Sequence, residues 1–217
     1  MILFETIEWI FFDVGSMIVD ESMAYQHRIE DTIKGTDITY QMFYDTMIQY
    51  YKQNKKGDIE TIKQYGLVKP KWHAEDERLY PEVKECFNLL RSNYKIGIIA
   101  NQSFGTKDRL QAFGVFKYID LIIASAEEGV SKPDLRIFEL ALKRAECMPE
   151  NAVMIGDRLD NDIAPAKTLG MKTIWIKQGF SGKYSIPRTD MEQADYIVNN
   201  LNEVRELFLA SKSSRKI

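Results

Sequence analysis

The sequence predicts an α/β fold: a doubly wound, Rossmann-like parallel sheet that carries an α-helical cap insertion. Short apolar runs rich in Ile and Val recur along the chain, and several lack polar alternation, as expected of strands buried on both faces. From about residue 81 onward, helical patterns alternate with these runs, which is typical of a parallel sheet covered by helices. The apolar runs are Ile7–Phe12, Ile96–Ala100, Leu121–Ala124, Ala152–Ile155, Thr173–Ile176 and Tyr196–Val198.

Helical patterns separate the apolar runs, and their ends carry recognisable signals. Pro133 is a favourable first-turn residue for the segment that it begins, and Gly114 and Gly170 stop two others. The segments expected to be helical are Pro81–Ser92, Lys107–Phe113, Pro133–Ala145, Asp162–Leu169 and Leu201–Ser211.

Residues from about 22 to 78 break this alternation. They contain no buried-strand run and look like a set of amphipathic helices punctuated by glycines. We therefore expect a core domain made of residues 1–20 and 79–217 and a helical cap domain made of residues 21–78. Pairing of residues 22–78 as strands in the main sheet would contradict this division. The expected cap helices are Ser22–Ile33, Thr39–Lys52 and Asp58–Tyr65.

Composition narrows the class of protein. Apolar residues make up 45% of the chain and charged residues 28%, which is ordinary for a folded globular protein. The net charge of −3 predicts no basic face, so nucleic acid is not expected as a partner. Two cysteines, Cys86 and Cys147, are too few for a disulfide framework or a zinc site and are expected to be reduced and mostly buried.

The location predicted from the sequence is the cytoplasm. The first residues, MILFETIEWIFFDVG, lack a basic start and a small-residue cleavage site, so no signal peptide is expected. No stretch approaches the roughly 18 apolar residues of a membrane span. No membrane association is expected. The sequence does not indicate the oligomeric state.

Polar residues follow the ends of several predicted strands. Asp13 follows the first run, and Asn101-Gln102-Ser103 follows the second. Lys132 lies in the loop after the third run, and Asp157 and Asp162 follow the fourth run. Because the carboxyl ends of parallel strands share one edge of a sheet, we expect these side chains to converge. Clustered carboxylates favour Mg²⁺, a hard cation with oxygen ligands, and an Asp at such an edge can attack phosphorus.

Four segments resemble the motifs of the haloacid dehalogenase superfamily, in the same order and spacing. They are Phe11–Val19, Ile96–Ser103, Ser131-Lys132-Pro133 and Gly156–Asp162. The helical insertion also lies where the helical cap of that family lies. The resemblance covers about residues 7 to 200, which is nearly the whole chain.

The resemblance implies a Mg²⁺-dependent phosphatase that acts on a small phosphorylated metabolite through an aspartyl-phosphate. Asp13 would be the nucleophile and a metal ligand, and Lys132 would hold Asp13 and the phosphoryl group. The backbone carbonyl of Gly15, with Asp157 and Asp162, would complete the metal site. The resemblance also places the strand before Asp13 in the centre of the sheet. Residues that would bind the phosphate are Asn101, Gln102, Ser103 and Lys132.

The chain departs from the family pattern at two positions. The family's phosphatases usually carry a second Asp two residues after the nucleophile, which protonates the leaving group and later activates water, and here that residue is Gly15. The second motif usually opens with Ser or Thr, and here it opens with Ala100. These changes predict a slow, selective or altered enzyme. Asp20, Glu21 and His73 are candidates to replace the missing acid.

Three other functions are compatible with parts of this pattern. A haloacid dehalogenase would use the same Asp to attack carbon without a metal, but that branch generally lacks the paired acids Asp157 and Asp162. A phospho-acceptor receiver domain is shorter and has no helical insertion. A catalytically weak member with a binding or regulatory role is suggested by Gly15 and Ala100, whereas Asp13 argues for activity. Trp72 is expected as a buried aromatic side chain, with stacking on a ligand as the alternative.

Overall fold

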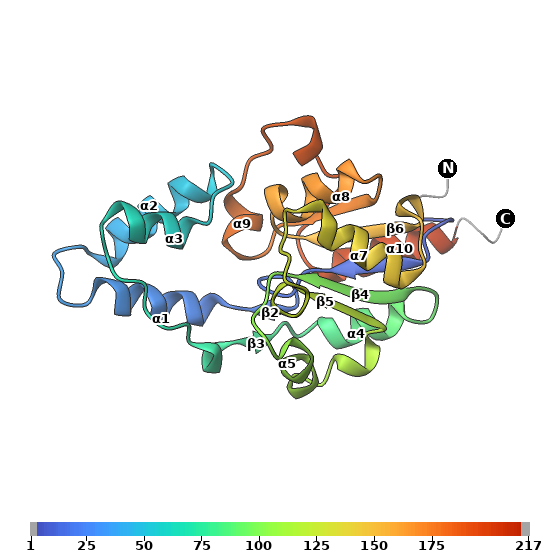
Figure 1. Cartoon of the computed structure of the whole chain (residues 1–217), viewed down its shortest axis with the longest axis horizontal. Coiled ribbons are helices and arrows are strands. Elements are labelled where there is room, and N and C mark those ends of the chain that lie inside the picture. Colours follow the sequence, from blue (N-terminus) through green and yellow to red (C-terminus); the bar gives the residue numbers. More distant parts are fainter. Residues whose placement is uncertain (1–3, 214–217) are drawn as a thin grey trace.

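The computed structural model describes residues 4–213 and shows a six-stranded, wholly parallel sheet (Figure 1). The strand order is β5-β4-β1-β6-β7-β8, so β1 lies between β4 and β6 near the centre of the sheet. The predicted α/β doubly wound fold is confirmed, and every predicted apolar run contains a strand. The strands are β1 (Trp9–Phe12), β4 (Lys95–Ala100), β5 (Leu121–Ala124), β6 (Ala152–Gly156), β7 (Lys172–Ile176) and β8 (Tyr196–Val198).

Helices cover both faces of the sheet. One apolar cluster joins one face to α4 (Val83–Leu90), α5 (Thr106–Ala112) and α10 (Leu201–Ser213). A second cluster joins the other face to α7 (Leu135–Ala145) and α8 (Ala164–Thr168). Burial on both faces explains why the strand sequences are continuously apolar. No helix among the described residues is long and apolar enough to cross a membrane.

Residues 22–76 form a separate helical segment beside the sheet (Figure 1). The three helices expected there are present, and they pack around their own apolar cluster of Ile29, Phe43, Met47, Tyr51 and Ile62. None of these residues pairs with a strand of the main sheet. The segment contains α1 (Ser22–Ile33), α2 (Tyr40–Tyr51), α3 (Gly57–Gln64) and the short turn η1 (Ala74–Asp76).

A small antiparallel ribbon joins the helical segment to the sheet. Its strands, β2 (Val19–Asp20) and β3 (Arg78–Leu79), pair through Val19 with Leu79 and Asp20 with Arg78. The ribbon was not predicted, because two-residue strands carry no periodic pattern. It brings the two connections of the helical segment side by side, directly after the loop that contains Gly15.

Several short elements were also absent from the sequence prediction. They are α6 (Ser125–Glu128), α9 (Gly179–Tyr184) and the 3₁₀ turns η2 (Phe116–Tyr118), η3 (Pro149–Asn151) and η5 (Asp190–Glu192). The helix expected from Asp162 begins earlier, as the π turn η4 (Leu159–Ile163), before α8 continues it. The two cysteines are free and buried, as expected.

Helix α9 lies between β7 and β8 in the sequence but packs against the helical segment (Figure 1). The Phe180 ring stacks on Tyr51, with ring centroids 5.6 Å apart, and meets Tyr25 edge-on at 5.0 Å. At its start, Gly179 has a positive φ of 60°, and a Cβ there would lie 2.4 Å from the Cβ of Ser16. Glycine at this position therefore lets α9 contact the loop after β1, and the next residue, Phe180, packs against the helical segment.

Candidate active site

Asp13 and Lys132 meet at the carboxyl end of the central strand. The Lys132 Nζ donates hydrogen bonds to Asp13 Oδ1 at 2.8 Å, to Asp162 Oδ1 at 2.6 Å and to the carbonyl of Ile99 at 2.8 Å. The Lys132 side chain is buried, so its three ammonium protons are satisfied by protein acceptors rather than by water. The ammonium group is thereby fixed beside the Asp13 carboxylate.

Asp157 and Asp162 reach the same point from the end of β6. Asp162 lies in the π turn η4, and its Oδ2 accepts a hydrogen bond from the backbone N–H of Arg158 at 3.0 Å. A Cβ at residue 156 would lie 2.3 Å from this oxygen, so Gly156 makes room for the carboxylate to fold back over the strand end. Carboxylate oxygens of Asp13, Asp157 and Asp162 all lie within 4.8 Å of one another.

Three acids and one lysine leave an excess of negative charge at this edge. Burial, with the charges of Asp162 and Asp13, raises the pKa of Asp157 well above its usual range. Burial also raises the pKa of Asp162 to about 6, although Lys132 opposes the shift. Burial alone would lower the pKa of Lys132, but the charges of Asp13 and Asp162 outweigh it and the pKa is raised. Buried oxygen ligands with uncompensated charge fit a hard divalent cation such as Mg²⁺.

The loop after β4 borders this cluster through two of its three predicted residues. The Asn101 side chain is held against Lys132, donating to its carbonyl at 2.9 Å and accepting from its N–H at 2.8 Å. The Gln102 side chain accepts a hydrogen bond from Arg109. Both Asn101 and Gln102 line a cavity that lies between the strand ends and the helical segment. Ser103 is exposed and is not among the described residues that line the cavity.

Glu21 lies beside Gly15 in the same cavity. A Cβ built on Gly15 would lie 2.9 Å from both carboxylate oxygens of Glu21, so this carboxylate fills the space next to Gly15. The hydroxyl of Ser16, which has a positive φ of 57°, donates to Glu21 Oε2 at 3.1 Å. Burial, together with the charges of Asp13 and Glu77, raises the pKa of Glu21 to about 7.

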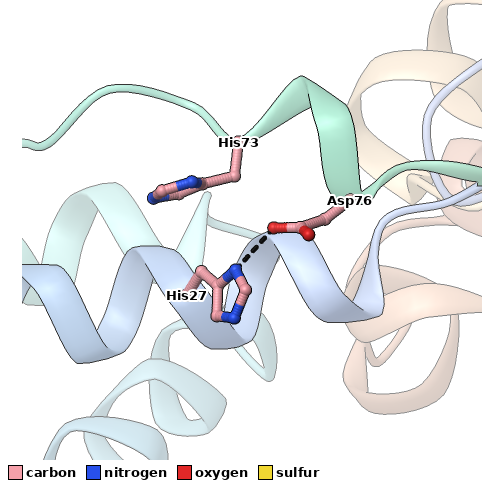
Figure 2. A group of neighbouring side chains, drawn as sticks. All are labelled: His27, His73 and Asp76. Carbon is pink, nitrogen blue, oxygen red and sulfur yellow. Dashed lines mark hydrogen bonds and ion pairs between the residues drawn. The ribbon is translucent and has the colours of Figure 1, made fainter.

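The two other candidates for the missing acid lie elsewhere. The Asp20 carboxylate accepts a hydrogen bond from the backbone at the start of α1. His73 pairs with Asp31 at 2.7 Å, and its ring lies 5.3 Å from that of His27, which pairs with Asp76 at 2.6 Å (Figure 2). These pairs join α1 to the returning chain near the ribbon. Neither Asp20 nor His73 is among the described residues that line the cavity.

A cavity of about 350 Å³ lies between the strand ends and the helical segment. Arg28 on its wall pairs with buried Asp58 at 2.6 Å, and its guanidinium lies 4.2 Å from the ring centre of Trp72. Trp72 is half-buried and lines the cavity, so it is more accessible than the buried aromatic that we expect from the sequence. Apart from Trp72, these wall residues are not predictable from the sequence, because amphipathic spacing does not show which side chains face a ligand. The helical segment and α9 contribute Tyr25, Arg28, Tyr51, Lys56, Trp72 and Phe180 to the wall.

Comparison with known proteins agrees with this geometry. The family model described as haloacid dehalogenase-like hydrolase matches residues 10–176, which is most of the chain. The chain belongs to the haloacid dehalogenase-like hydrolase family. The match includes the four segments that surround the cavity, from Asp13 to Asp162, and the whole helical segment between β2 and β3.

Relatives of this hydrolase include enzymes named as phosphatases. The glyceraldehyde 3-phosphate phosphatase of Pyrococcus furiosus is 29% identical over 97% of this chain and 96% of the relative. A crystal structure of a phosphatase of the same family from Thermococcus onnurineus has a TM-score of 0.66 and 23% identity, covering 93% of this chain and 98% of that one. A 2-haloacid dehalogenase from Pseudomonas syringae has a TM-score of 0.63 and 17% identity, covering 94% and 99%. The fold is therefore shared by both chemistries, and the choice between them depends on the site.

Proposed function

We propose that this hydrolase is a Mg²⁺-dependent phosphatase that acts on a small phosphorylated metabolite through an aspartyl-phosphate on Asp13. The observation that carries the proposal is the position of the Asp13 carboxylate, fixed by Lys132 beside Asp157 and Asp162 at the floor of the cavity. The phosphatase-named relatives support the reaction class. The cavity of about 350 Å³ has the size of a site for a small molecule.

The residues present fit a magnesium ion. Asp13, Asp157 and Asp162 would hold it with the backbone carbonyl of Gly15, as the resemblance implies. When bound, Mg²⁺ would neutralise the negative charge of the phosphoryl group and of the surrounding acids. Burial, together with neighbouring carboxylates, raises the pKa values of Asp157 and Asp162, and a bound cation would offset this cost of ionising them.

The protein's own residues supply positioning and the nucleophile. An Asp13 oxygen attacks phosphorus, the bond to the leaving group breaks, and water then hydrolyses the aspartyl-phosphate to phosphate and free Asp13. Lys132 keeps the carboxylate in place and compensates charge in the transition state. Asn101 and Gln102 border the phosphoryl group, and Ser103 follows in the same loop. Two hydrogen bonds hold the Asn101 side chain to the Lys132 backbone, so these two parts of the proposed phosphate site are fixed relative to each other.

The helical segment is proposed to act as a cap domain, residues 21–78, on a core domain of residues 1–20 and 79–217. Its aromatic and basic side chains form the wall opposite the strand ends, where the part of the substrate beyond the phosphate would lie. Closure by such a cap excludes water from the reacting centre. We propose the cytoplasm as its location, which two free, buried thiols suit.

The dehalogenase reaction fits the site less well. It would need the same nucleophile but no cation, so extra buried acids would add only repulsion. Here Asp157 and Asp162 both lie within reach of Asp13, and burial, with a smaller contribution from neighbouring carboxylates, raises their pKa values. A site with this charge suits a cation and a phosphate better than a neutral carbon–halogen bond.

The test is an assay on p-nitrophenyl phosphate and a panel of sugar, nucleotide and acyl phosphates, with Mg²⁺ or with EDTA. We expect turnover that needs Mg²⁺ and is lost in the Asp13→Asn variant, which keeps the size of the side chain. The panel member with the highest kcat/KM identifies the substrate class. Absence of turnover by the wild-type protein on every panel member would refute the proposal and leave a binding or regulatory role.

A further inference from the structure

Glu21 is the carboxylic acid in the cavity that the proposed reaction has not used. We propose that Glu21 is the general acid and general base of the reaction, acting from the space beside Gly15. This inference rests on the proposed phosphatase function. It concerns how the leaving group receives its proton and how water is activated.

A phosphomonoester of an ordinary alcohol needs a proton donor, because an alkoxide is a poor leaving group. Asp13 is occupied as the nucleophile, and Asp157 and Asp162 lie in the cluster proposed to hold the cation. The Lys132 ammonium donates to three protein acceptors and has no proton directed at a substrate. Glu21 is the acid of the described cavity wall that remains.

The contacts of Glu21 leave one of its oxygens available. Its Oε2 accepts a hydrogen bond from Ser16 at 3.1 Å, and no ion pair to Glu21 is found among the described residues. A carboxyl group without a cationic partner can bind and release a proton. Ser16 lies in the same loop as Asp13, so its hydrogen bond fixes the acid relative to the nucleophile.

Gly15 makes the position of Glu21 specific. The two Glu21 oxygens lie 2.9 Å from where a Cβ of residue 15 would be, so a side chain at residue 15 would displace the Glu21 carboxylate from its present position. Residue 15 follows the nucleophile by two positions. Glu21 therefore delivers a carboxyl group, from six residues further along, to the space beside the backbone that carries Asp13.

The steps balance with the groups present. Asp13 attacks phosphorus, the bond from phosphorus to the alcohol oxygen breaks, and that oxygen takes the proton of the Glu21 carboxylic acid. The products are the free alcohol, aspartyl-phosphate and the Glu21 carboxylate. Glu21 then takes a proton from water as the water oxygen attacks phosphorus, the bond to Asp13 breaks, and phosphate leaves. Glu21 is again protonated and Asp13 is again a carboxylate.

The first test compares two leaving groups in the wild type and in the Glu21→Gln variant. Glutamine keeps the size and can still accept the Ser16 hydrogen bond, but it carries no transferable proton. We expect turnover of an alkyl phosphate to fall by about 10²–10⁴-fold. With p-nitrophenyl phosphate, whose leaving group needs no proton, the first step should persist while hydrolysis of the intermediate slows. Rapid mixing should then show a burst of about one p-nitrophenolate per active site, followed by slow turnover.

The second test moves the carboxyl group. The Gly15→Asp variant alone should lose activity, because the new side chain crowds Glu21. Glu21→Ala should lose activity on the alkyl phosphate. The double variant Gly15→Asp with Glu21→Ala should be at least about tenfold more active on this substrate than Glu21→Ala. Asp20→Asn is the matched control, because Asp20 is the adjacent acid but its carboxylate faces the start of α1, and an Asn oxygen can keep that contact.

The outcomes separate the two proposals. A burst with Glu21→Gln and rescue by the double variant support the role of Glu21. Equal loss on both substrates without a burst, or unchanged turnover of the alkyl phosphate, overturns it while leaving a working phosphatase. A wild-type protein without activity on either substrate overturns this inference together with the proposed function. If Glu21→Gln does not fold, as judged by circular dichroism, the double variant alone decides through rescue or its absence.

Discussion

The two walls of the cavity differ in the charge of the side chains that line them. At the strand ends, Asp13, Asp157 and Asp162 crowd around the ammonium of Lys132, with more negative charge than it can compensate. In the helical segment, Arg28 pairs with Asp58 at 2.6 Å in a buried setting, and Lys56 also lines the wall. Aromatic rings make up much of the rest of that wall. The first wall therefore has an excess of negative charge, which a bound cation would offset, whereas the second consists of basic and aromatic side chains.

This difference separates two tasks. Uncompensated charge is suited to binding a cation and a phosphate, and it lowers the stability of the protein that holds neither. An aromatic and basic wall contributes shape, which can select among substrates that share the phosphate.

Asp157→Asn should separate activity from stability. We expect kcat/KM to fall by at least about 10²-fold, because a charge that compensates the reaction is lost. In EDTA, we expect the urea midpoint at neutral pH to rise, because burial and the nearby Asp162 and Asp13 carboxylates make an ionisable group at this position costly in the folded state. The bond from Trp175 to residue 157 uses the backbone carbonyl and is retained. A lower midpoint in EDTA would show that the strand-end wall is not strained by its charges.

Arg28→Met should destabilise the helical segment. Asp58 is fully buried, so loss of its partner leaves an unpaired charge, at a cost of about 3–5 kcal/mol. The double variant with Asp58→Leu should return close to wild-type stability, since neither charge then remains. Urea unfolding of the single and double variants gives both values. A double variant as unstable as the single one would mean that the pair does more than compensate charge.

Phe180→Ala should loosen the helical segment and leave the sheet unchanged. The ring contacts Tyr51, Tyr25 and Tyr44 at centroid distances of 5.6, 5.0 and 5.9 Å. At about 0.5–1.5 kcal/mol for each of the three aromatic pairs, local opening should become easier by ~1.5–4.5 kcal/mol. Amide hydrogen exchange should speed up in α1 to α3 but not in β1 or β6. Uniform acceleration would instead indicate that the two parts unfold as one.

His73→Gln tests the smallest effect, the pH dependence of the contact between α1 and η1. Hydrogen bonds to Asp31 and then to Glu75 raise the pKa of His73. Stability from this group is therefore fully present below its unfolded pKa of about 6.5 and is lost as pH rises through the folded value. The melting temperature of the wild type should exceed that of the variant by more near pH 6 than near pH 8. A difference independent of pH would mean that His73 has the same pKa in the folded and unfolded states.

The sequence was sufficient for the sheet and for the residues at its edge. Buried parallel strands require continuous apolar runs, and such runs are visible without a structure. Asp13, Lys132, Asp157 and Asp162 were expected to meet because of one rule, that the carboxyl ends of parallel strands share an edge, and the structure brings them together. Their catalytic roles remain predictions.

The other wall of the cavity could not be predicted, for physical reasons. Helix α9, Gly179–Tyr184, has two glycines in six residues and no apolar periodicity, and it is held by the packing of Phe180 rather than by its own propensity. The burial of Arg28 was not predictable from the helix pattern, because its partner Asp58 is 30 residues away. Glu21 was one of three candidates, and only the return of the chain after Ser16 shows that it reaches Gly15.

The 2.9 Å approach of Glu21 to the missing Cβ of residue 15 also restricts how this protein can change over generations. Residues 15 and 21 share one space, so the effect of a substitution at either depends on the residue at the other. A lineage that gained a side chain at residue 15 first would pass through a crowded intermediate, whereas one that first shortened Glu21 would pass through an open one. The order of mutations, and not only their sum, therefore decides which sequences are accessible from this one.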